Sequence, residues 1–441
     1  MGSKWPIMTI EECASSEPYS TQIGPFGKAL MADEYVDSGV PVLRGVNVNN
    51  GRFHDDDFVF IDEETADRLS KFESFPGDVL LCHKGTLGQI GLMPNNRKYS
   101  RYIMGNSMLR VRCNTEVLLP QYLYYWLSSA DGQHYLFSRV SQVGVPQIQT
   151  PLATLRQAEL PIPPINEQRC IAHILGTLDD KIELNRRMNE TLEAIARALF
   201  KSWFVDFDPV RAKAEGRDTG LPAHIADLFP DSFEDSELGK IPSGWEVRSL
   251  DEIAKFTNGL ALQKYPPQGG KSLPVIKIAQ LRAGNAEGAD AAGADLDPDY
   301  IVDDGDVLFS WSGSLECVLW AGGEGALNQH LFKVTSDEFP KWLYYLWIHH
   351  HLDDFRFIAA GKATTMGHIQ RHHLTDAKVV LPTKASVKIG THVVGPMLDA
   401  SWKLKVQSRT LTQLLDALLP KMISGEMRVR DAKRIATEAV V

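Results

Sequence analysis

Two aspartates are the strongest candidates for catalytic chemistry in this chain. Asp78 stands in Gly77-Asp78-Val79-Leu80 shortly before Lys84, and Asp306 stands in a second Gly-Asp-Val-Leu stretch. Carboxylates that hold Mg²⁺ beside a lysine near the attacking water are typical of metal nucleases, so a stand-alone metal-dependent DNA nuclease is one hypothesis. The spacing departs from that pattern. In the second copy, residues 310–312 include serines where a basic residue would be required. We therefore favour a structural turn beside a strand.

Histidines and cysteines are not spaced as metal ligands. His349, His350 and His351 are adjacent, so a helix would point them to different faces, and we expect solvated side chains. His372 and His373 are better placed to lie near a phosphate, and His368 precedes them. No C-x-x-C pair exists, so neither a zinc cluster nor a disulfide framework is indicated, and a reducing cytoplasm is expected. The five cysteines are Cys13, Cys82, Cys113, Cys170 and Cys317.

Motifs of the common enzyme classes are missing from the sequence. There is no G-x-x-x-x-G-K-[ST] phosphate loop, no G-x-G-x-x-G, no H-E-x-x-H and no G-x-S-x-G. Asp208-Pro209-Val210 comes nearest to an aminomethyltransferase tetrapeptide, and it lacks the second proline and the aromatic residue that would stack on a flipped base. Nor do enough apolar residues run together to span a bilayer. These absences predict a chain without catalytic residues, metal, cofactor or membrane span.

The charge is acidic overall but unevenly distributed. The formal net charge is -10, which disfavours a polyanionic partner because Lys and Arg supply most non-specific nucleic-acid affinity. However, residues 205–238 contain nine acids and three bases, so -6 of the total belongs to this segment. Residues 97–112, by contrast, contain five bases and no acid, interleaved with tyrosines. Arg97, Lys98 and Arg101 are therefore candidate phosphate contacts, with a merely solvated face as the alternative.

The sequence repeats one plan twice. The first match, of residues 5–12 with residues 245–252, has an offset of 240, and later matches follow at 233, 228, 222, 220 and 221 residues. Their order never changes, and the offsets shrink almost steadily, as a second copy with shorter loops would produce. These later matches join Pro41–Arg44 to Pro274–Lys277, Gly77–Leu80 to Gly305–Leu308, Asn106–Leu109 to Asn328–Leu331, Pro120–Tyr125 to Pro340–Tyr345, and Ile148-Gln149 to Ile369-Gln370. We therefore predict an internal duplication.

Each copy ends in a long predicted helix. Asn166 follows a proline-rich breaker and is a candidate N-cap, and apolar residues then recur at alternating steps of four and three as far as Trp203. The second helix begins near Ser386, and Gly395-Pro396 is expected to interrupt it. The predicted seam residues are Leu175, Leu178, Ile182, Asn185, Asn189 and Leu192 in the first helix and Leu398, Trp402, Leu411 and Leu415 in the second.

Both seams have polar middles, which favours an antiparallel pair of helices. Such a pair would bring Asn185 and Asn189 against Lys405 and Ser408, where buried polar groups specify the register at some cost in stability. An unbroken first helix over residues 167–203 would be about 55 Å long. The alternative is two separate amphipathic helices, each lying on its own domain.

The stretches before the helices are typical of mixed α and β structure. Short β-rich runs lie between Gly, Asn and Asp turns, and two aromatic stretches, 123–127 and 343–350, indicate helices. The predicted strands are 58–61, 79–81, 109–111, 307–309 and 379–381. No strand and helix alternation indicates a doubly wound sheet. The fold class is therefore α+β, with two pseudo-symmetric domains separated by two long helices packed as an antiparallel coiled coil.

Several further side chains suit contact with DNA. The loops after each Gly-Asp-Val-Leu stretch are flanked by glycines, which permit close backbone approach, and their donors are Lys84, Thr86, Ser312 and Ser314. A tight turn without a ligand is the alternative. Side chains able to make paired hydrogen bonds to purine edges follow later in each copy, namely Gln147, Gln149, Gln370 and Arg371. Capping of the loops before the next strands is the alternative for these.

Four segments resemble a known family. They are Leu160–Gln168, Leu199–Val210, Leu238–Trp245 and Leu418–Glu426, and together they span nearly the whole chain. Tandem variable domains, each closed by a Leu-Pro-x-Pro-Pro-x-x-Glu-Gln-like start of a long helix, look like the specificity (S) subunit of type I restriction-modification systems. The second helix start, Leu381–Ser386, departs from that pattern because it lacks the double proline and the Glu-Gln.

The resemblance implies a non-catalytic subunit that binds a bipartite double-stranded DNA target. It implies recognition domains at 1–164 and 241–383 and conserved helices at 165–206 and 384–425, which leaves an acidic linker at 207–240 and a tail at 426–441. The implied partners are two DNA methyltransferase (M) subunits, which bind S-adenosylmethionine, and a motor-endonuclease (R) subunit. By analogy, the recognition surfaces fall on the loops named above.

Two rival hypotheses make different predictions. A stand-alone nuclease would cut DNA with Mg²⁺ and no partners, and Asp78→Ala would abolish the cleavage. A coiled-coil interaction protein would never touch DNA. Salt-dependent DNA binding by the assembled complex, with a slope reduced when Arg97 and Arg101 become alanine, would exclude that third hypothesis.

Overall fold

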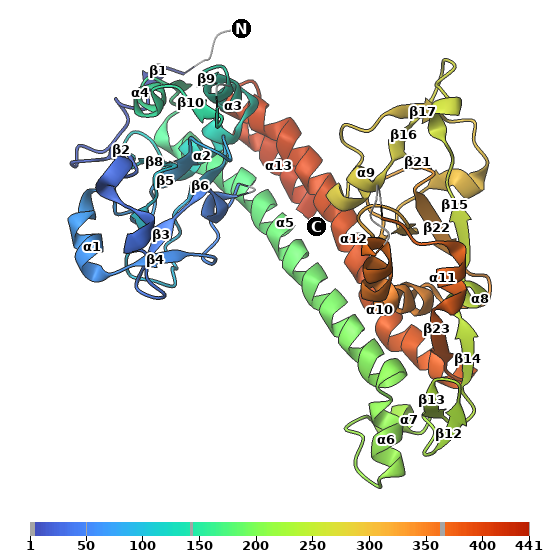
Figure 1. Ribbon diagram of the computed structural model, residues 1–441. Helices are drawn as coiled ribbons and strands as arrows, with labels where there is room; N and C mark the ends of the chain where they lie inside the picture. Colours follow the sequence, from blue (N-terminus) through green and yellow to red (C-terminus); the bar gives the residue numbers. More distant parts are fainter. Residues whose placement is uncertain (1–4, 50, 142–143, 362–366, 441) are drawn as a thin grey trace. The chain divides into compact units, whose positions relative to one another are not determined.

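The computed structural model describes residues 5–49, 51–141, 144–361 and 367–440, and it divides into two compact units. Unit 1 comprises residues 1–181 and 411–441, and unit 2 comprises residues 182–410. The two longest helices, α5 (Ile165–Phe200) and α12 (Lys384–Ile423), contribute to both units (Figure 1). Each unit thus contains one α+β domain together with a segment of each long helix.

Unit 1 is built on a four-stranded antiparallel sheet of order β2-β8-β5-β6 and a three-stranded sheet of order β4-β3-β7, in which β3 and β7 are parallel. Val42, Leu80 and Met108 from these strands share one buried core. The elements before α5 are β1 (Ile7–Thr9), β2 (Thr21–Ile23), β3 (Val40–Leu43), β4 (Val59–Ile61), α1 (Glu63–Arg68), β5 (Val79–Cys82), β6 (Ile90–Leu92), β7 (Ile103–Met104), β8 (Met108–Val111), α2 (Pro120–Ser128), α3 (Ala130–Phe137), β9 (Val140–Ser141), β10 (Gln147–Ile148), α4 (Pro151–Arg156) and β11 (Glu159–Pro161).

Unit 2 repeats this plan with the sheets β15-β22-β19-β20 and β17-β16-β21-β18, in which β16 and β21 are parallel. Its elements are α6 (Asp208–Ala214), α7 (Ala223–Ala226), β12 (Phe233–Ser236), β13 (Gly239–Pro242), β14 (Glu246–Ser249), α8 (Leu250–Ile253), β15 (Lys255–Asn258), β16 (Ser272–Ile276), α9 (Ile278–Ala283), β17 (Ala291–Gly293), β18 (Ile301–Val302), β19 (Val307–Ser310), β20 (Cys317–Leu319), β21 (Gly325–Leu327), β22 (Leu331–Thr335), α10 (Lys341–Ala360), α11 (Arg371–Asp376) and β23 (Lys378–Leu381). The five strands predicted from the sequence and both aromatic helices are present.

The matching topologies confirm the duplication, but they correct one alignment. The amide of Gly105 donates to the carbonyl of Leu43 at 2.8 Å, and the amide of Asn328 donates to the carbonyl of Ile276 at 3.3 Å. These carbonyls end the equivalent strands β3 and β16. Asn328 is therefore equivalent to Gly105, at an offset of 223, and not to Asn106 as the shared asparagine had indicated. Backbone pairing defines the alignment more reliably than one shared residue type.

Helix α12 is continuous through Gly395 and Pro396, so the interruption expected there is wrong. Gly390 serves a packing purpose, because a Cβ there would lie 2.3 Å from the indole of Trp342. Val394 and Leu398, on either side of Pro396, are buried in the core of unit 2. A proline costs roughly 3 kcal/mol inside a helix, and burial of its helical neighbours opposes that cost.

The two long helices begin with different anchors. Gln168 of α5 is fully buried, and its amide bonds the backbone of Leu119 at 2.8 Å and of Val117 at 2.8 Å. Helix α12 lacks that glutamine, and instead the hydroxyl of Ser386 donates to the carbonyl of Leu228 at 2.8 Å. The second helix start therefore departs from the first because it is tied to the preceding acidic segment.

The helices α5 and α12 pack together antiparallel, as predicted (Figure 1). Asn185 donates to Gln407 at 2.8 Å, whereas Glu193, two turns further along α5, accepts from Lys405 at 2.8 Å. The hydroxyl of Ser401 also donates to Glu193, at 2.9 Å. Burial alone would raise the pKa of Glu193, but the Lys405 ammonium and these hydrogen bonds lower it overall. The polar middle is thus paired, with Gln407 and Ser401 in place of the expected Ser408.

The predicted seam residues divide into two groups by burial. Leu175, Leu178, Asn185, Leu398 and Leu411 are buried. The other five are half-buried, namely Ile182, Asn189, Leu192, Trp402 and Leu415. The buried members lie in both units, so each unit covers part of both helices.

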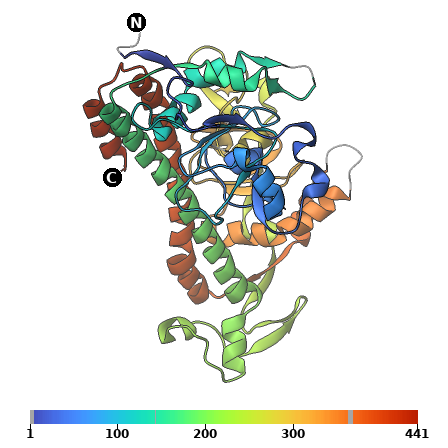
Figure 2. The ribbon, with the colours of Figure 1, turned by 90° about the vertical axis from the view of Figure 1, so that its left-hand side faces the viewer.

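The acidic segment, expected as a linker, and the tail both contain helices. The acidic segment continues from the end of α5 as α6, α7 and the hairpin β12-β13 (Figures 1 and 2). Phe207, Val210 and Phe229 of this segment are buried in the core of unit 2. The tail forms α13 (Val429–Val440), in which Ala432 is buried. The charge count of the acidic segment did not indicate these elements, because a few buried apolar residues suffice to attach such a segment to a core.

Candidate nucleic-acid interface

The loop after β5 in unit 1 is held against β10. Lys84 pairs with Gln147 in an antiparallel bridge, and the amide of Ile148 donates to the carbonyl of His83 at 3.0 Å. The amide of Gly85 donates to Pro146 at 3.2 Å, and its φ of +83° favours glycine. The structure thus gathers four of the sequence-predicted DNA contacts in one exposed place, namely Lys84, Thr86, Gln147 and Gln149.

Unit 2 has the same construction after β19. Ser312 pairs with His368 in an antiparallel bridge, and the amide of Ile369 donates to the carbonyl of Trp311 at 2.9 Å. The amide of Gly313 donates to Gly367 at 2.8 Å. Ser314, Gln370 and Arg371 are exposed beside this loop, whereas Ser312 is buried. We call the two constructions the reading loops, residues 83–88 with 146–149 in unit 1 and 311–315 with 367–371 in unit 2.

The other candidate phosphate contacts of unit 1 make contacts within their own domain. Arg101 forms ion pairs with Glu63 and Asp67 at 2.8 Å each and with Glu73 at 3.1 Å. The backbone amide of Lys98 donates to a carboxylate of Asp55 at 2.7 Å. The guanidinium of Arg97 lies 5.7 Å from the ring centre of Tyr102. The charge of Arg101 in particular is already balanced within the domain.

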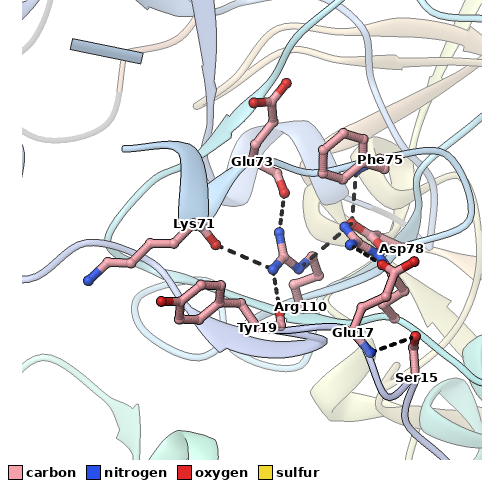
Figure 3. Close-up of polar contacts among 9 residues, drawn as sticks. Ser15, Glu17, Tyr19, Lys71, Glu73, Phe75, Asp78 and Arg110 are labelled. Atoms are coloured by element: carbon pink, nitrogen blue, oxygen red, sulfur yellow. Dashed lines mark hydrogen bonds and ion pairs between the residues drawn. The ribbon is translucent and has the colours of Figure 1, made fainter. Parts of the chain in front are cut away.

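Asp78 is buried and fully engaged, so it stabilises the fold. Its side chain is 1% exposed, and it accepts hydrogen bonds from the Phe75 amide at 2.8 Å and from Nε and Nη2 of Arg112 at 2.9 and 3.0 Å. The buried Arg110 lies close by, with Nε at 3.7 Å (Figure 3). Among the residues that the structure describes, no three His, Cys, Asp or Glu side chains are grouped to hold a metal ion. Asp78 is therefore not available as a nuclease carboxylate.

Unit 2 contains a simpler version of this buried cluster. Arg110 donates to the carbonyl of Glu73 in unit 1 (Figure 3), and Lys333 donates to the equivalent carbonyl of Ile301 at 2.7 Å. Lys333 also lies 3.0 Å from Asp306. Burial lowers the pKa of Arg110 to about 10 and Asp78 opposes that shift, so the guanidinium stays charged at neutral pH. The Gly-Asp-Val-Leu motif is thus a structural motif in both units.

The histidines of α10 are less exposed than expected, so that expectation is wrong for two of them. Nε2 of His351 lies 2.9 Å from the carbonyl of Lys378. Burial lowers the pKa of His349 to about 4, so its ring is neutral at physiological pH. The long aromatic helix turns these side chains toward the sheet, and only His350 remains exposed.

Sequence reasoning missed a polar network beneath the reading loop of unit 2. Nε1 of Trp311 donates to Oδ1 of Asn258 at 2.9 Å and to the carbonyl of Gln329 at 3.1 Å. Oγ of Ser312 lies 3.0 Å from Nδ1 of His330. Trp311 directly follows the strand of the second Gly-Asp-Val-Leu motif, so the repeat alignment could have drawn attention to it. Nothing in the sequence pattern indicated Asn258.

Together, the fold and the loops define a class of protein in which two copies of one α+β domain share a pair of long helices and each copy presents an exposed polar loop. The chain belongs to the family of the type I restriction modification DNA specificity domain, whose model matches residues 22–194 and 242–390. The two matched segments correspond to the two copies. The chain is a DNA specificity subunit of a type I restriction-modification system, a class without catalytic function of its own.

Curated relatives agree with this assignment. The chain is 24% identical over 417 residues to the type I restriction enzyme HindI specificity subunit of Haemophilus influenzae, with 81% of this chain and 90% of that protein covered. It is 25% identical over 385 residues to the MjaIX specificity subunit of Methanocaldococcus jannaschii, with 83% and 82% covered.

A solved structure has the same fold. The type I restriction-modification S subunit from M. genitalium superposes with a TM-score of 0.55 at 14% identity, and the match covers 96% of each chain. Within the described part of the chain, no helix is both long and apolar enough to cross a membrane.

Proposed function

We propose that this subunit recognises a DNA target made of two separate half-sites, one read by each reading loop. The recognition domains would comprise residues 1–164 and 241–383, and the conserved helices 165–206 and 384–425 would set the distance between the half-sites. Two methyltransferase subunits that carry S-adenosylmethionine, and a motor-endonuclease subunit, would complete the complex. The segments 207–240 and 426–441 would join these parts and close the chain.

One observation carries this proposal, namely that the same loop is built twice with different exposed side chains. The loop backbones make equivalent bonds, Ile148 to His83 and Ile369 to Trp311. The exposed side chains differ, because Lys84 is exposed in unit 1 whereas its counterpart Ser312 is buried in unit 2. The exposed side chains of the unit 2 loop are Ser314, Gln370 and Arg371. A duplicated backbone with divergent side chains is what two readers of different base sequences require, because phosphate contacts position a protein whereas base contacts specify sequence.

Mapping of modified bases in a host that carries the intact system tests the proposal. We expect methylation at a sequence with two specified parts separated by unspecified bases. Methylation of one contiguous sequence, or of no sequence that depends on this subunit, would overturn the proposal.

Lys84→Ala is expected to weaken DNA binding by the assembled methyltransferase complex to a similar extent for all sequences. A lysine that contacts a phosphate releases one counterion, so the slope of log affinity against log salt should fall by about one. Affinity is measured between 50 and 200 mM salt, with Lys421→Ala, an exposed lysine of the same unit on α12, as the control. An unchanged slope for Lys84→Ala would remove Lys84 from the interface.

A second surface supports docking of the methyltransferase on α5. Leu184, Met188 and Ile195 recur at helical spacing and are 51%, 44% and 43% exposed. They lie on a face that the seam does not use, since the seam residue Asn185 is 1% exposed. A stripe of exposed apolar side chains on one helix face is typical of a helix that receives a partner.

Leu184→Glu combined with Met188→Glu is expected to weaken association with the purified methyltransferase at least ten-fold, because each change places a charge in an apolar interface. Titration calorimetry measures the association. The matched control is Ala194→Glu, which places the same charge on another exposed face of α5 and should leave the association unchanged. Equal affinity of the Leu184→Glu, Met188→Glu double variant and the wild type would place the methyltransferase elsewhere.

A further inference from the structure

Asn258 is an exposed asparagine whose backbone is fixed at the end of β15. It pairs with Phe332 of β22 in the antiparallel register. The next residue, Gly259, donates its amide to Leu331 at 3.0 Å, and a Cβ at Gly259 would lie 2.3 Å from the carbonyl oxygen of Asn328. The backbone beside Asn258 is therefore packed so closely that its side chain starts from a defined position.

Trp311 fixes the orientation of the Asn258 amide. Its Nε1 lies 2.9 Å from Oδ1 of Asn258 and 3.1 Å from the carbonyl of Gln329, and an indole N–H can only donate. The amide therefore turns its oxygen, and not its nitrogen, to Trp311. Trp311 is itself held, because its ring packs against His330 and Phe332 with centroids 5.7 and 6.2 Å away.

This oriented amide is bonded to the reading loop of unit 2. Trp311 is the first residue of that loop, and its carbonyl accepts from Ile369, which precedes Gln370 and Arg371. Oδ1 of Asn258 retains a second lone pair beside the one that Trp311 uses, so the amide still presents an acceptor and a donor side by side. That pair matches the N6–H donor and the N7 acceptor of adenine in the major groove.

Unit 1 has no counterpart of this arrangement. Its strand register places Ile23 at the position of Asn258, and His83 at the position of Trp311. Ile23 has no polar side-chain atoms, and His83 is buried with Nε2 at 3.2 Å from the carbonyl of Asn106. An oriented amide at this place is therefore specific to unit 2.

We propose that Asn258, oriented by the indole N–H of Trp311, reads an adenine in the half-site bound by unit 2. The inference rests on the proposed function, since it needs that unit to meet DNA through its reading loop. Asn258 is the base-contacting residue, and Trp311 is a positioning residue. An amide that is already oriented binds its base with higher affinity than a freely rotating one, because ordering a mobile side chain on binding costs affinity.

Removal of N7 from one adenine at a time tests the proposal directly. The assembled methyltransferase complex is titrated with its mapped target, and each adenine of the unit 2 half-site, on either strand, is replaced in turn by 7-deazaadenine. We expect the wild type to lose about ten-fold in affinity at one position. Asn258→Ala should bind the unmodified target about ten- to one-hundred-fold more weakly and should be insensitive to the replacement at that position.

Trp311→Phe separates positioning from folding. This variant keeps an aromatic ring but loses the N–H, so the Asn258 amide can rotate. We expect reduced discrimination at the same adenine, by about two- to ten-fold, with unchanged discrimination at the other positions. A purely structural role would weaken binding equally at all positions. Thermal melting of each complex verifies that the variants are folded.

The matched control is Asn285→Ala, because the Asn285 amide oxygen accepts from the Glu287 amide at 3.0 Å within its own turn. It should bind as the wild type does. If Asn258→Ala remains as sensitive to 7-deazaadenine as the wild type at every adenine, the inference is wrong while the proposed function stands. If the wild-type complex binds no bipartite target at all, the proposed function itself fails.

Discussion

Insertion of four residues into both α5 and α12 is expected to change the number of unspecified bases between the half-sites and to leave the half-sites themselves unchanged. The insertions would be made at facing positions, after Glu193 in α5 and before Ser401 in α12, which meet in the antiparallel pair. Each helix would lengthen by about 6 Å, since one residue advances it by about 1.5 Å. Because one DNA turn of about 10 base pairs advances about 34 Å, the tolerated spacing should grow by one or two base pairs.

A seven-residue insertion is the stricter form of this experiment. Four residues rotate the seam by about 40°, whereas seven residues restore it almost completely because the seam repeats every seven residues. The longer insertion should therefore extend the spacing by about three base pairs with a smaller loss of stability. Modified-base mapping in a host with each variant provides the measurement.

Insertion into α5 alone is the control for the spacing experiment. Asn185 and Glu193 can keep their partners Gln407 and Lys405 in this variant, but the part of α5 after Glu193 would be out of register with the part of α12 before Ser401. The insertion should therefore weaken the helix pair without producing a new target. The contradicting outcome is that the double variants are folded and still direct methylation to the original sequence with its original spacing. That result would show that the helices do not set the distance between the half-sites.

Asp78→Ala is expected to destabilise the protein by about 3–5 kcal/mol, the usual cost of removing one partner from a buried ion pair. Asp78 and Arg110 have side chains that are 1% and 2% exposed, so water cannot replace the lost carboxylate. Arg112 would lose two hydrogen bonds as well. Urea unfolding of the full chain measures the loss.

The equivalent change in unit 2 is the matched control. Asp306 and its partner Lys333 have side chains that are 23% and 16% exposed, so solvent can compensate in part, and Asp306→Ala should cost clearly less. Asp78→Asn keeps the shape of the side chain and the acceptor for the Phe75 amide but removes the charge. Its free energy of unfolding should lie between those of the wild type and Asp78→Ala. A wild-type unfolding midpoint for Asp78→Ala would contradict the structural role assigned here.

Much of the architecture could be predicted because it depends on patterns local in the sequence. The strands around Val79 and Val307 are bounded by turns and rich in β-formers, so they were identified without the fold. The polar middle of the helix pair followed from the positions of Asn185 and Lys405 in their seams. The break predicted at Pro396 was wrong because local propensity indicates one, whereas Val394 and Leu398 on either side are buried in the core of unit 2.

The candidate site was predicted less completely, because the partner of a polar side chain lies far away in the sequence. Arg101 was predicted from the sequence as a phosphate contact, but in the structure it forms ion pairs with three carboxylates of its own domain, those of Glu63, Asp67 and Glu73. Asn258 had no signal at all, since its partner Trp311 is 53 residues away. Two residues so far apart in the sequence come into contact only when the chain has folded.

The amino-acid sequence alone determined that this protein is a duplication with two long amphipathic helices and no recognisable catalytic motif, because periodicity, spacing and residue type are properties of neighbouring positions. Only the tertiary structure decided which polar residues are buried and paired within the fold and which are exposed in the loops. Asp78 and Lys84 stand six positions apart, yet one is buried against Arg112 and the other is exposed in a reading loop. Burial and pairing, which set what a charged group can do, arise when distant segments meet.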